Sequence, residues 1–387
     1  MQRNWVLAMA RKGNDRVCRH SPRLHLSLLL RAMFFLATLL GSGCISVPAY
    51  TELRASNAVL PTATADIDVD GRSRFRDIFC TLAKNHGESV QRLTNNCEPL
   101  LWRLQDESPA GAEIALPPLH AALQIFVVGG VFSDCFGAAS RVFPHVIERL
   151  VDEGYPVSTL AISSRSSADY NARMIAADLV SAPNAPIVLV GYSKGAVDIA
   201  HFLVNYPDLA KRVAAVVSLA GPIMGSEIAA YGDWTYNTFF TDSFADRCAP
   251  GDGGVLDSLQ PQVRRAWLSS HKLPGTVRYY TLLAFADRDH IARALLPTWD
   301  ILASKDPRND GQVTLSEGTW PNSTLLGYAN ADHWSIATEI ETEFEFLASR
   351  HDVTPYPRGV LFEAALRYVS EDLRNHETPK ASQDIAL

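Results

Sequence analysis

One segment of ten residues constrains the fold more than any other part of the 387-residue chain. In Ile187-Val-Leu-Val-Gly-Tyr-Ser-Lys-Gly-Ala196, four apolar residues run into glycine, and apolar residues at helical spacing begin at Ala196. This order predicts a buried strand, a sharp turn and a helix, the setting in which G-x-S-x-G forms a nucleophile elbow. Glycines avoid crowding at such a turn, and the first helical amides point at the Ser193 hydroxyl. An ordinary glycine-rich turn is the alternative interpretation.

Strand-like and helix-like segments alternate from residue 121 onward. The expected strands are Leu123–Val128, Val157–Ile162, Ile187–Val190, Val213–Leu219 and Val277–Phe285, and the expected helices are Ala138–Glu153, Ser167–Ser181, the segment after Ser193, and Val360–Leu373. Apolar strands separated by helices predict an α/β fold, with a mostly parallel central sheet flanked by helices.

Two further segments accompany this domain, which we assign to residues 121–387. Residues 73–120 predict a small N-terminal helical unit, with Phe75 and Ile78 on its apolar face. Residues 222–275 separate two core strands, are irregular, and contain several aromatic residues, which predicts a lid-like insertion over the site. The alternative is a helical insertion that buries its aromatic side chains.

The charge of the chain is unevenly distributed. Residues 1–43 carry seven Arg and Lys and one Asp, a net charge of +6, and the total of −7 therefore leaves −13 on the remainder. An acidic body argues against nucleic acid as a partner. The basic residues precede the apolar run Met33–Leu40, the pattern of an export signal. This run is too short to span a bilayer as a stable anchor.

The end of the signal, Gly41-Ser-Gly-Cys44, resembles a bacterial lipoprotein signal, although Gly41 stands where Leu is usual. The resemblance implies a lipid on Cys44, a membrane anchor, and a location in the cell envelope facing the periplasm or the exterior. Residues 44–72 would then be a tether. A plain cleaved signal, an uncleaved anchor that includes Leu24–Leu30, and a translation start at Met9 are the alternatives.

Cysteine usage agrees with export. Apart from two cysteines in the N-terminal segment, four remain: Cys80, Cys97, Cys135 and Cys248. In an oxidising compartment they permit two disulfides with three connectivities, of which we expect Cys80–Cys97 and Cys135–Cys248.

No metal ion or cofactor is expected. The chain contains no C-x-x-C and no G-x-x-x-x-G-K-[ST] loop. The acidic run Asp66-Ile-Asp-Val-Asp-Gly71 imitates the start of a calcium loop, but a solvated acidic turn is the better interpretation, since no helix precedes it.

A serine hydroxyl becomes a good nucleophile only when a base removes its proton. Among the histidines after Ser193, His333 follows the predicted core strands and precedes a helix, so it is our candidate base. His201 lies on the elbow helix itself and cannot turn back to the serine, and His376 lies in a polar tail.

A carboxylate that fixes the tautomer of the base completes such a site. Asp310, in the turn-prone Asn309-Asp-Gly311, precedes His333 by 23 residues and is the candidate. Asp287 and Asp289, directly after an expected strand, are alternatives, whereas Asp198 precedes every strand that could carry the acid. For the oxyanion we expect the amides of Lys194 and Val131, the latter in the loop with Gly129-Gly130.

Three features resemble the α/β-hydrolase superfamily, in particular its lipase- and esterase-like members. They are the Gly191–Gly195 elbow, Leu219-Ala-Gly-Pro-Ile-Met-Gly-Ser226, and Asn309-Asp-Gly311 followed by Asp332-His333-Trp334. The resemblance covers about residues 121–375. Two departures, Gly129-Gly130 in place of His-Gly and Lys194 in place of His, Met or Gln, leave the substrate class open.

The resemblance implies a serine hydrolase that forms an acyl-enzyme on carboxylic esters, with a small-molecule or lipid ester as substrate. An acyltransferase that uses the same site is one alternative. A catalytically silent, surface-anchored binding protein with this fold is the other.

Overall fold

The computed structural model describes residues 67–85, 97–104, 107, 113–135, 137–231, 251–340 and 356–377. Met1–Val47 form one unit of the chain and Pro48–Leu387 another, and every described residue belongs to the second. The predicted export signal, Cys44, most of the predicted tether, Cys248 and the aromatic part of the predicted insertion (232–250) lie outside the described residues.

A sheet in the order β1-β8-β7-β6-β5-β3-β4 organises the described residues, and all neighbours along this path are parallel. A short further strand, β2, pairs with β8 in the antiparallel sense. The bounds are β1 Ile67–Asp70, β2 Leu101–Trp102, β3 Gln124–Val128, β4 Val157–Thr159, β5 Ile187–Tyr192, β6 Val213–Leu219, β7 Arg278–Phe285 and β8 Ser323–Asn330. The predicted parallel α/β fold is therefore confirmed.

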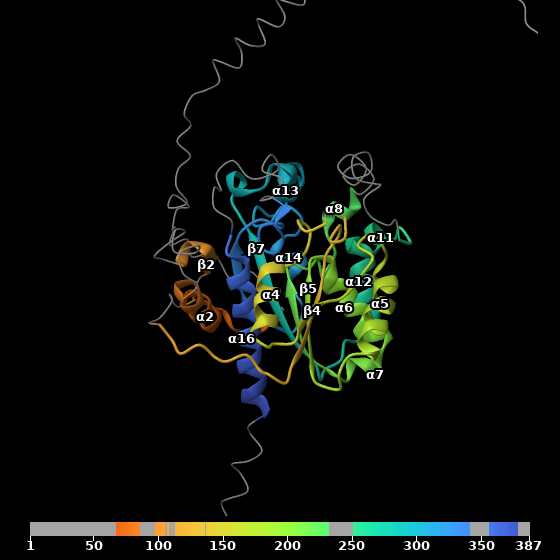
Figure 1. The fold of residues 1–387 in the computed structure, drawn as a ribbon. Helices are drawn as coiled ribbons and strands as arrows, with labels where there is room; N and C mark the ends of the chain where they lie inside the picture. The colour runs from red at the N-terminus through yellow and green to blue at the C-terminus, as the bar shows by residue number, and fades with distance from the viewer. Residues whose placement is uncertain are drawn as a thin grey trace, which may run out of the picture. The chain divides into compact units, whose positions relative to one another are not determined.

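Helices cover both faces of the sheet (Figure 1). Alternate residues of β5 divide between two apolar clusters: Val188 and Val190 belong to one, Ile187 and Leu189 to the other. The first cluster also contains α2 (Arg72–Asn85), α4 (Pro144–Asp152) and α16 (Arg358–Glu377), and the second contains α5 (Ala168–Val180), α6 (Lys194–Asn205) and part of α12 (Pro261–Ser270). Burial on both faces explains why β5 and β6 are almost entirely apolar.

Shorter helices lie between these elements. They are η2 (Glu98–Leu100), α7 (Pro207–Ala210), α8 (Glu227–Ala230), α11 (Val255–Leu259), η5 (Arg288–His290), η6 (Arg293–Leu295), α13 (Leu296–Ala303) and α14 (Leu315–Gly318). α8, α11 and α12 belong to the predicted insertion, 222–275.

The helix expected from Ala138 begins only at Pro144. Phe143 has a left-handed backbone, with φ of 53°, and Pro144 occupies the first turn of α4. Proline is favoured there because its missing N–H has no helical partner to lose. The turn residues before it do not extend the helix.

The C-terminal bound of the predicted tether, 44–72, is wrong, because the tether includes residues that belong to the sheet. Ile67–Asp70 form β1, which pairs with the first half of β8, and β2 pairs with its second half. Residues 73–120 are likewise not only helical, since they contain β2 as well as α2. Together β1 and β2 cover an edge of β8 that would otherwise expose unpaired amides and carbonyls.

The predicted Cys80–Cys97 disulfide is present, with 5.3 Å between the Cα atoms. It joins α2 to the start of η2. Next to it the buried Arg76 guanidinium donates to the Glu107 carboxylate over 2.5 Å and to the Leu101 carbonyl over 3.0 Å. These bonds attach the N-terminal segment to the strand that follows it. The Cys135–Cys248 pairing includes a residue outside the described ones.

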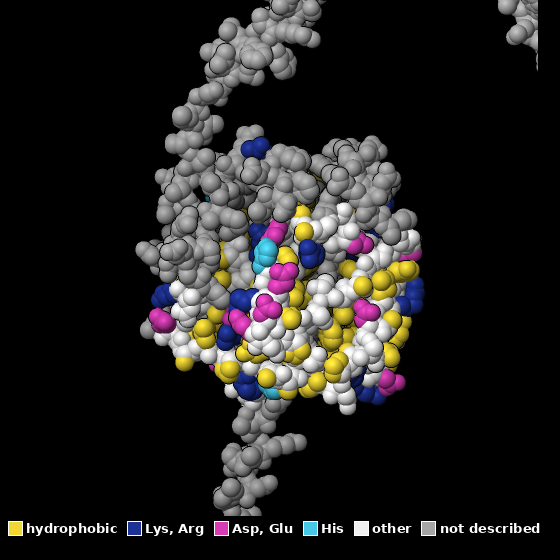
Figure 2. All heavy atoms as spheres, viewed as in Figure 1, with side chains coloured by type: hydrophobic (Ala, Val, Ile, Leu, Met, Phe, Trp, Pro, Cys, Tyr) yellow, Lys and Arg dark blue, Asp and Glu magenta, His cyan; other side chains and the backbone are white. Residues whose placement is uncertain are grey.

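The face shown in Figure 2 carries hydrophobic, acidic and basic side chains interspersed over the helices. Large exposed apolar residues among the described ones are scattered singly: Val69, Val151, Val180, Tyr231 and Val263. Of the helices described, none is long and apolar enough to cross a membrane.

Candidate active site

Ser193 occupies the turn between β5 and α6. Its backbone has φ of 53° and ψ of −129°, a conformation that costs a non-glycine residue about 1–3 kcal/mol. The Ser193 amide donates to the Leu219 carbonyl at the end of β6, over 2.9 Å. The predicted elbow is therefore present, and the strand and helix on either side hold the serine in a strained turn.

The two motif glycines are required by close packing. A Cβ on Gly191 would lie 2.5 Å from the backbone nitrogen of Ala196, and a Cβ on Gly195 would collide with the Val128 carbonyl. α6 can approach β5 and β3 this closely only because neither position has a side chain.

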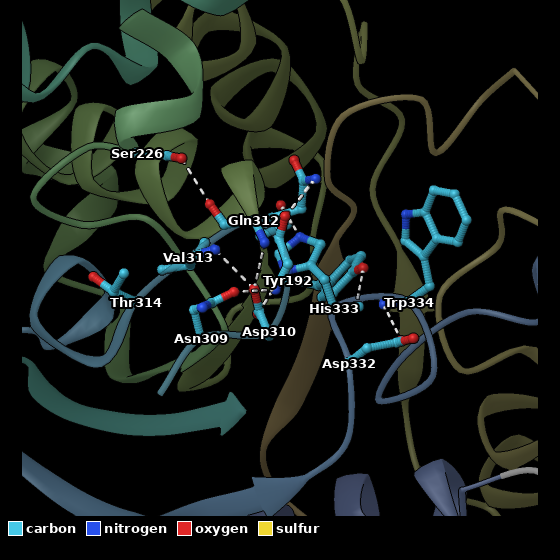
Figure 3. Close-up of polar contacts among 12 residues, drawn as sticks. Tyr192, Ser226, Asn309, Asp310, Gln312, Val313, Thr314, Asp332, His333 and Trp334 are labelled. Carbon is cyan, nitrogen blue, oxygen red and sulfur yellow. Dashed lines mark hydrogen bonds and ion pairs between the residues drawn. The ribbon is translucent and has the colours of Figure 1, made fainter. Parts of the chain in front are cut away.

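His333 lies directly after β8, and its ring faces Ser193. Its Nε2 is 2.8 Å from the Ser193 Oγ. Its Nδ1 is 2.7 Å from Oδ2 of Asp310 (Figure 3). All three residues are buried, with at most 8% of their surface exposed. A proton on Nδ1 would be held by Asp310, which leaves Nε2 free to accept the serine proton.

Asp310 is fixed by its own loop between β7 and β8. Its Oδ1 accepts the amides of Gln312 (2.8 Å) and Val313 (2.7 Å), and its carbonyl accepts the His333 amide (2.9 Å). Gly311 permits this tight turn with φ of 94°. One carboxylate oxygen is thus held by main-chain amides, and the other faces the imidazole.

The alternative acids do not reach the site. Asp287 and Asp289 are exposed at the end of β7. Asp198 is buried on α6, where it accepts from the Lys194 ammonium and, over 2.8 Å, from the Asn171 amide. Burial raises the pKa of the Asp198 carboxyl, while the Lys194 charge acts in the opposite direction.

His201 is excluded as the base by its surroundings. Its Nδ1 is 2.7 Å from the Asp169 carboxylate, and its Nε2 accepts from the Arg264 guanidinium over 2.8 Å. Burial lowers the pKa of His201 to about 4 and that of Arg264 to about 10. The imidazole is therefore neutral at pH 7 and serves to connect α5, α6 and α12.

Of the two expected oxyanion donors, Lys194 follows the serine directly in sequence, and Val131 follows Gly130 in a loop that packs against the serine. Lys194 begins α6, and its side chain is buried against Asp198, so its main chain is the part that faces the turn. A Cβ on Gly130 would lie 2.7 Å from the Ser193 Cβ, so the loop that leads to Val131 passes against the serine. The assignment of both amides remains a prediction.

Two residues to which the sequence analysis gave no role hold the His333 loop. The Tyr192 hydroxyl donates to the His333 carbonyl over 2.6 Å. The buried Asp332 carboxylate accepts the amides of Ala292 (2.7 Å), Trp334 (3.0 Å) and Ser335 (2.8 Å). Tyr192 occupies the first unspecified position of G-x-S-x-G, and Asp332 directly precedes His333. Their closeness to the site in sequence did not show which groups they would bind.

Apolar side chains adjoin both sides of the site. Trp334, next to the base, packs in a cluster with Trp299, Ile291 and Leu296, and it remains partly exposed. Val131 packs with Val255 of α11 and its neighbours. Among the described residues no group of three or more His, Cys, Asp or Glu side chains could hold a metal ion.

No protein-family model and no curated protein matches the chain. Among solved structures, it is similar to the metagenomic carboxyl esterase MGS0156, at 35% identity over 81% of this chain and 96% of the esterase, with a TM-score of 0.69. It is also similar to the Bacillus licheniformis lipase BlEst2 in its mature form, at 24% identity over 60% of this chain and 91% of that one, with a TM-score of 0.43. A third similar structure is phospholipase PlaB from Legionella pneumophila, at 17% identity over 51% of this chain and 45% of that one, with a TM-score of 0.37.

Proposed function

The chain belongs to the α/β-hydrolase family of the metagenomic carboxyl esterase, and we propose that it hydrolyses carboxylic esters through an acyl-enzyme on Ser193. One observation carries the proposal: the bonded series from the Ser193 Oγ through the His333 ring to the Asp310 carboxylate. Each group is within hydrogen-bonding distance of the next, as a general base and its orienting acid require.

In the proposed mechanism the Ser193 oxygen attacks the ester carbonyl carbon while His333 Nε2 takes the hydroxyl proton. The carbonyl oxygen becomes an oxyanion that accepts from the Lys194 and Val131 amides. The imidazolium, stabilised by Asp310, then donates its proton to the departing alkoxide, and the acyl-enzyme forms. Water, deprotonated by the same imidazole, releases the acid and regenerates the serine.

The substrate class follows from the apolar side chains around the site. Trp334 and Trp299 lie on the histidine side, and Val131 packs with the apolar residues of α11 on the other. An ester with an apolar acyl or aromatic part gains free energy when it leaves water for such surroundings. We therefore expect small apolar or lipid esters to be preferred over charged ones.

Hydrolysis of a series of p-nitrophenyl esters, from acetate to palmitate, tests this function. The wild-type protein should cleave them, and Ser193→Ala should reduce kcat by about 10⁴- to 10⁶-fold. Ser269→Ala, which changes an exposed serine of α12, is the control and should cleave like the wild type. Formation of a new ester when an alcohol is added would identify an acyltransferase instead.

We also propose that the protein is exported and anchored to the cell envelope through a lipid on Cys44. The basic start of the chain, the apolar run Met33–Leu40 and the small residues before Cys44 support this. The Cys80–Cys97 disulfide agrees with an oxidising compartment. Mass spectrometry of the mature N-terminus should find an acylated Cys44, and Cys44→Ser should release the protein from membranes.

A further inference from the structure

The first turn of the insertion contacts the loop that carries Asp310. The Met224 amide donates to the Glu317 carbonyl over 2.8 Å, and the Glu227 amide donates to the Glu317 carboxylate over 2.6 Å. Between these two bonds, the Ser226 hydroxyl donates to the Gln312 carbonyl over 2.6 Å (Figure 3). One bond therefore joins residues 224–227 to the loop of Asp310, here called the acid loop, and two join them to α14, which follows that loop.

The bond from Ser226 reaches Asp310 through a single peptide group. The Gln312 carbonyl and the Val313 N–H belong to the same planar peptide unit. The Ser226 hydroxyl donates to the oxygen of that unit, and the Val313 N–H of the same unit donates to Oδ1 of Asp310 over 2.7 Å. Hydrogen bonds arranged in series polarise one another, so the Ser226 hydroxyl strengthens the amide that holds the carboxylate.

We propose that Ser226 is a positioning residue for the acid. It fixes the 312–313 peptide, which in turn fixes the rotation of the Asp310 carboxylate and keeps Oδ2 directed at His333. The inference rests on the proposed function, because it assigns Asp310 to the catalytic site. Ser226 itself touches neither Asp310 nor the serine nucleophile in these bonds, and so it acts only through the peptide.

The position of Ser226 is itself well determined. Its amide donates to the Leu259 carbonyl over 2.8 Å, and its Oγ accepts the Ile228 amide over 3.2 Å as the N-cap of α8. The preceding Gly225 has φ of 93° and packs so closely on Pro261 that a Cβ would lie 2.6 Å from the proline Cα. The acid loop is thereby connected to the junction of α11 and α12.

The chain offers a matched control on the same residue. The Gln312 side-chain amide donates to the Thr298 hydroxyl over 3.0 Å, and that hydroxyl donates to the Leu295 carbonyl. Thr298→Val removes these two hydrogen bonds, as Ser226→Ala removes those to the Gln312 carbonyl and from the Ile228 amide, but it takes no bond from the 312–313 peptide. Both variants should lower the melting temperature by similar amounts.

The test compares Ser226→Ala, Ser226→Thr and Thr298→Val by steady-state hydrolysis of a p-nitrophenyl ester and by the downfield proton resonance of the His333 Nδ1–H. We expect Ser226→Ala to lower kcat about five- to tenfold at unchanged KM, the loss of one hydrogen bond of ordinary net strength. The resonance should move in this variant. Ser226→Thr, which retains a hydroxyl, should restore both, and Thr298→Val should alter neither.

Equal kcat values in Ser226→Ala and Thr298→Val, with the resonance unmoved, would overturn the proposal. If Ser226→Ala does not fold, Ser226→Gly is measured in its place, since glycine is tolerated at an N-cap at little cost. The resonance reports on positioning without any substrate. A wild-type protein that cleaves no ester but whose resonance moves in Ser226→Ala would contradict the proposed function and leave the role of Ser226 intact.

Discussion

Ser193 combines two properties that are hard to satisfy at once: a strained backbone and a buried hydroxyl aimed at an imidazole. Close packing at Gly191 and Gly195 and the hydrogen bond from the Ser193 amide to the Leu219 carbonyl hold the strained turn. The hydroxyl then lies 2.8 Å from His333 without a side-chain rearrangement. At the scale of single residues, the site depends on this preorganisation.

Replacement of the acid separates the two assignments that the sequence left open. Asp310→Asn should lower kcat by about 10³- to 10⁴-fold, because an amide donates to the imidazole and stabilises the wrong tautomer. Asp287→Asn, at an exposed position after β7, should leave kcat within a factor of two. Steady-state kinetics on one ester measure both. A severe defect in Asp287→Asn with a normal Asp310→Asn would refute the assignment.

The buried His201 should make stability depend on pH. Its pKa is about 4 in the folded protein and 6.5 when free, so between these values the unfolded chain binds a proton that the folded chain does not. The free energy of unfolding therefore falls as pH decreases from about 6.5 to 4, by at most about 3 kcal/mol, and rises again as pH increases. Asp169 and Arg264 are the charged groups that contact the ring.

Urea unfolding at pH 4.5 and pH 7 measures this effect in the wild type and in His201→Gln. Glutamine can donate to Asp169 and accept from Arg264, but it does not titrate. The variant should lose less stability on acidification than the wild type does. An identical loss in both proteins would show that His201 is not responsible.

At this scale the sequence indicated candidate residues where a motif specifies a residue type. Ser193, Asp310 and His333 lie in motifs, and the structure brings all three together. Tyr192, Asp332 and Ser226 also lie in the quoted motifs, but their roles were not inferred, because they bind main-chain groups of segments that are distant or irregular. No pattern of residue types encodes which carbonyl a hydroxyl will reach.

Among the elements, α2 carries a covalent cross-link to a distant part of the chain. It packs Phe75, Ile78 and Phe79 against α16 and β8, and Cys80 joins it to Cys97. The two cysteines are separated by 17 positions in sequence. For a loop of this length, removal of the disulfide should lower the free energy of unfolding by about 3 kcal/mol. Calorimetry of Cys80→Ser/Cys97→Ser should show the loss as a lower melting temperature.

Esterase activity serves as the control for this change, because the bonded residues of the site lie on other elements. At temperatures well below melting, kcat of the double variant should match the wild type. An unchanged melting temperature would mean that the apolar contacts of α2 suffice without the disulfide.

Elements with a strong apolar pattern were predictable, and those with a mixed pattern were not. β5 and β6 are almost entirely apolar and agree with the predicted strands. β8 contains Ser323, Gly327 and Asn330, and it was missed even though it is buried along its whole length. β1 and β2 were missed for another reason: they are strands only because the edge of β8 offers hydrogen-bond partners.

For the molecule as a whole, the order of strands assembles the site. β5, β7 and β8 are parallel members of one sheet, so the segments that follow their carboxyl ends meet at the same edge. Ser193 follows β5, Asp310 lies between β7 and β8, and His333 follows β8. The chain order of serine, acid and histidine agrees with the order known for this fold.

The central claim is that Ser193 is an activated nucleophile, and covalent labelling tests it most directly. The wild-type protein is incubated with a fluorophosphonate probe, and the mass of the intact chain and of its peptides is measured. We predict one adduct per chain, on Ser193, and none on Ser193→Ala. A folded wild-type protein that takes up no probe, or that takes it up at another residue, would contradict the account.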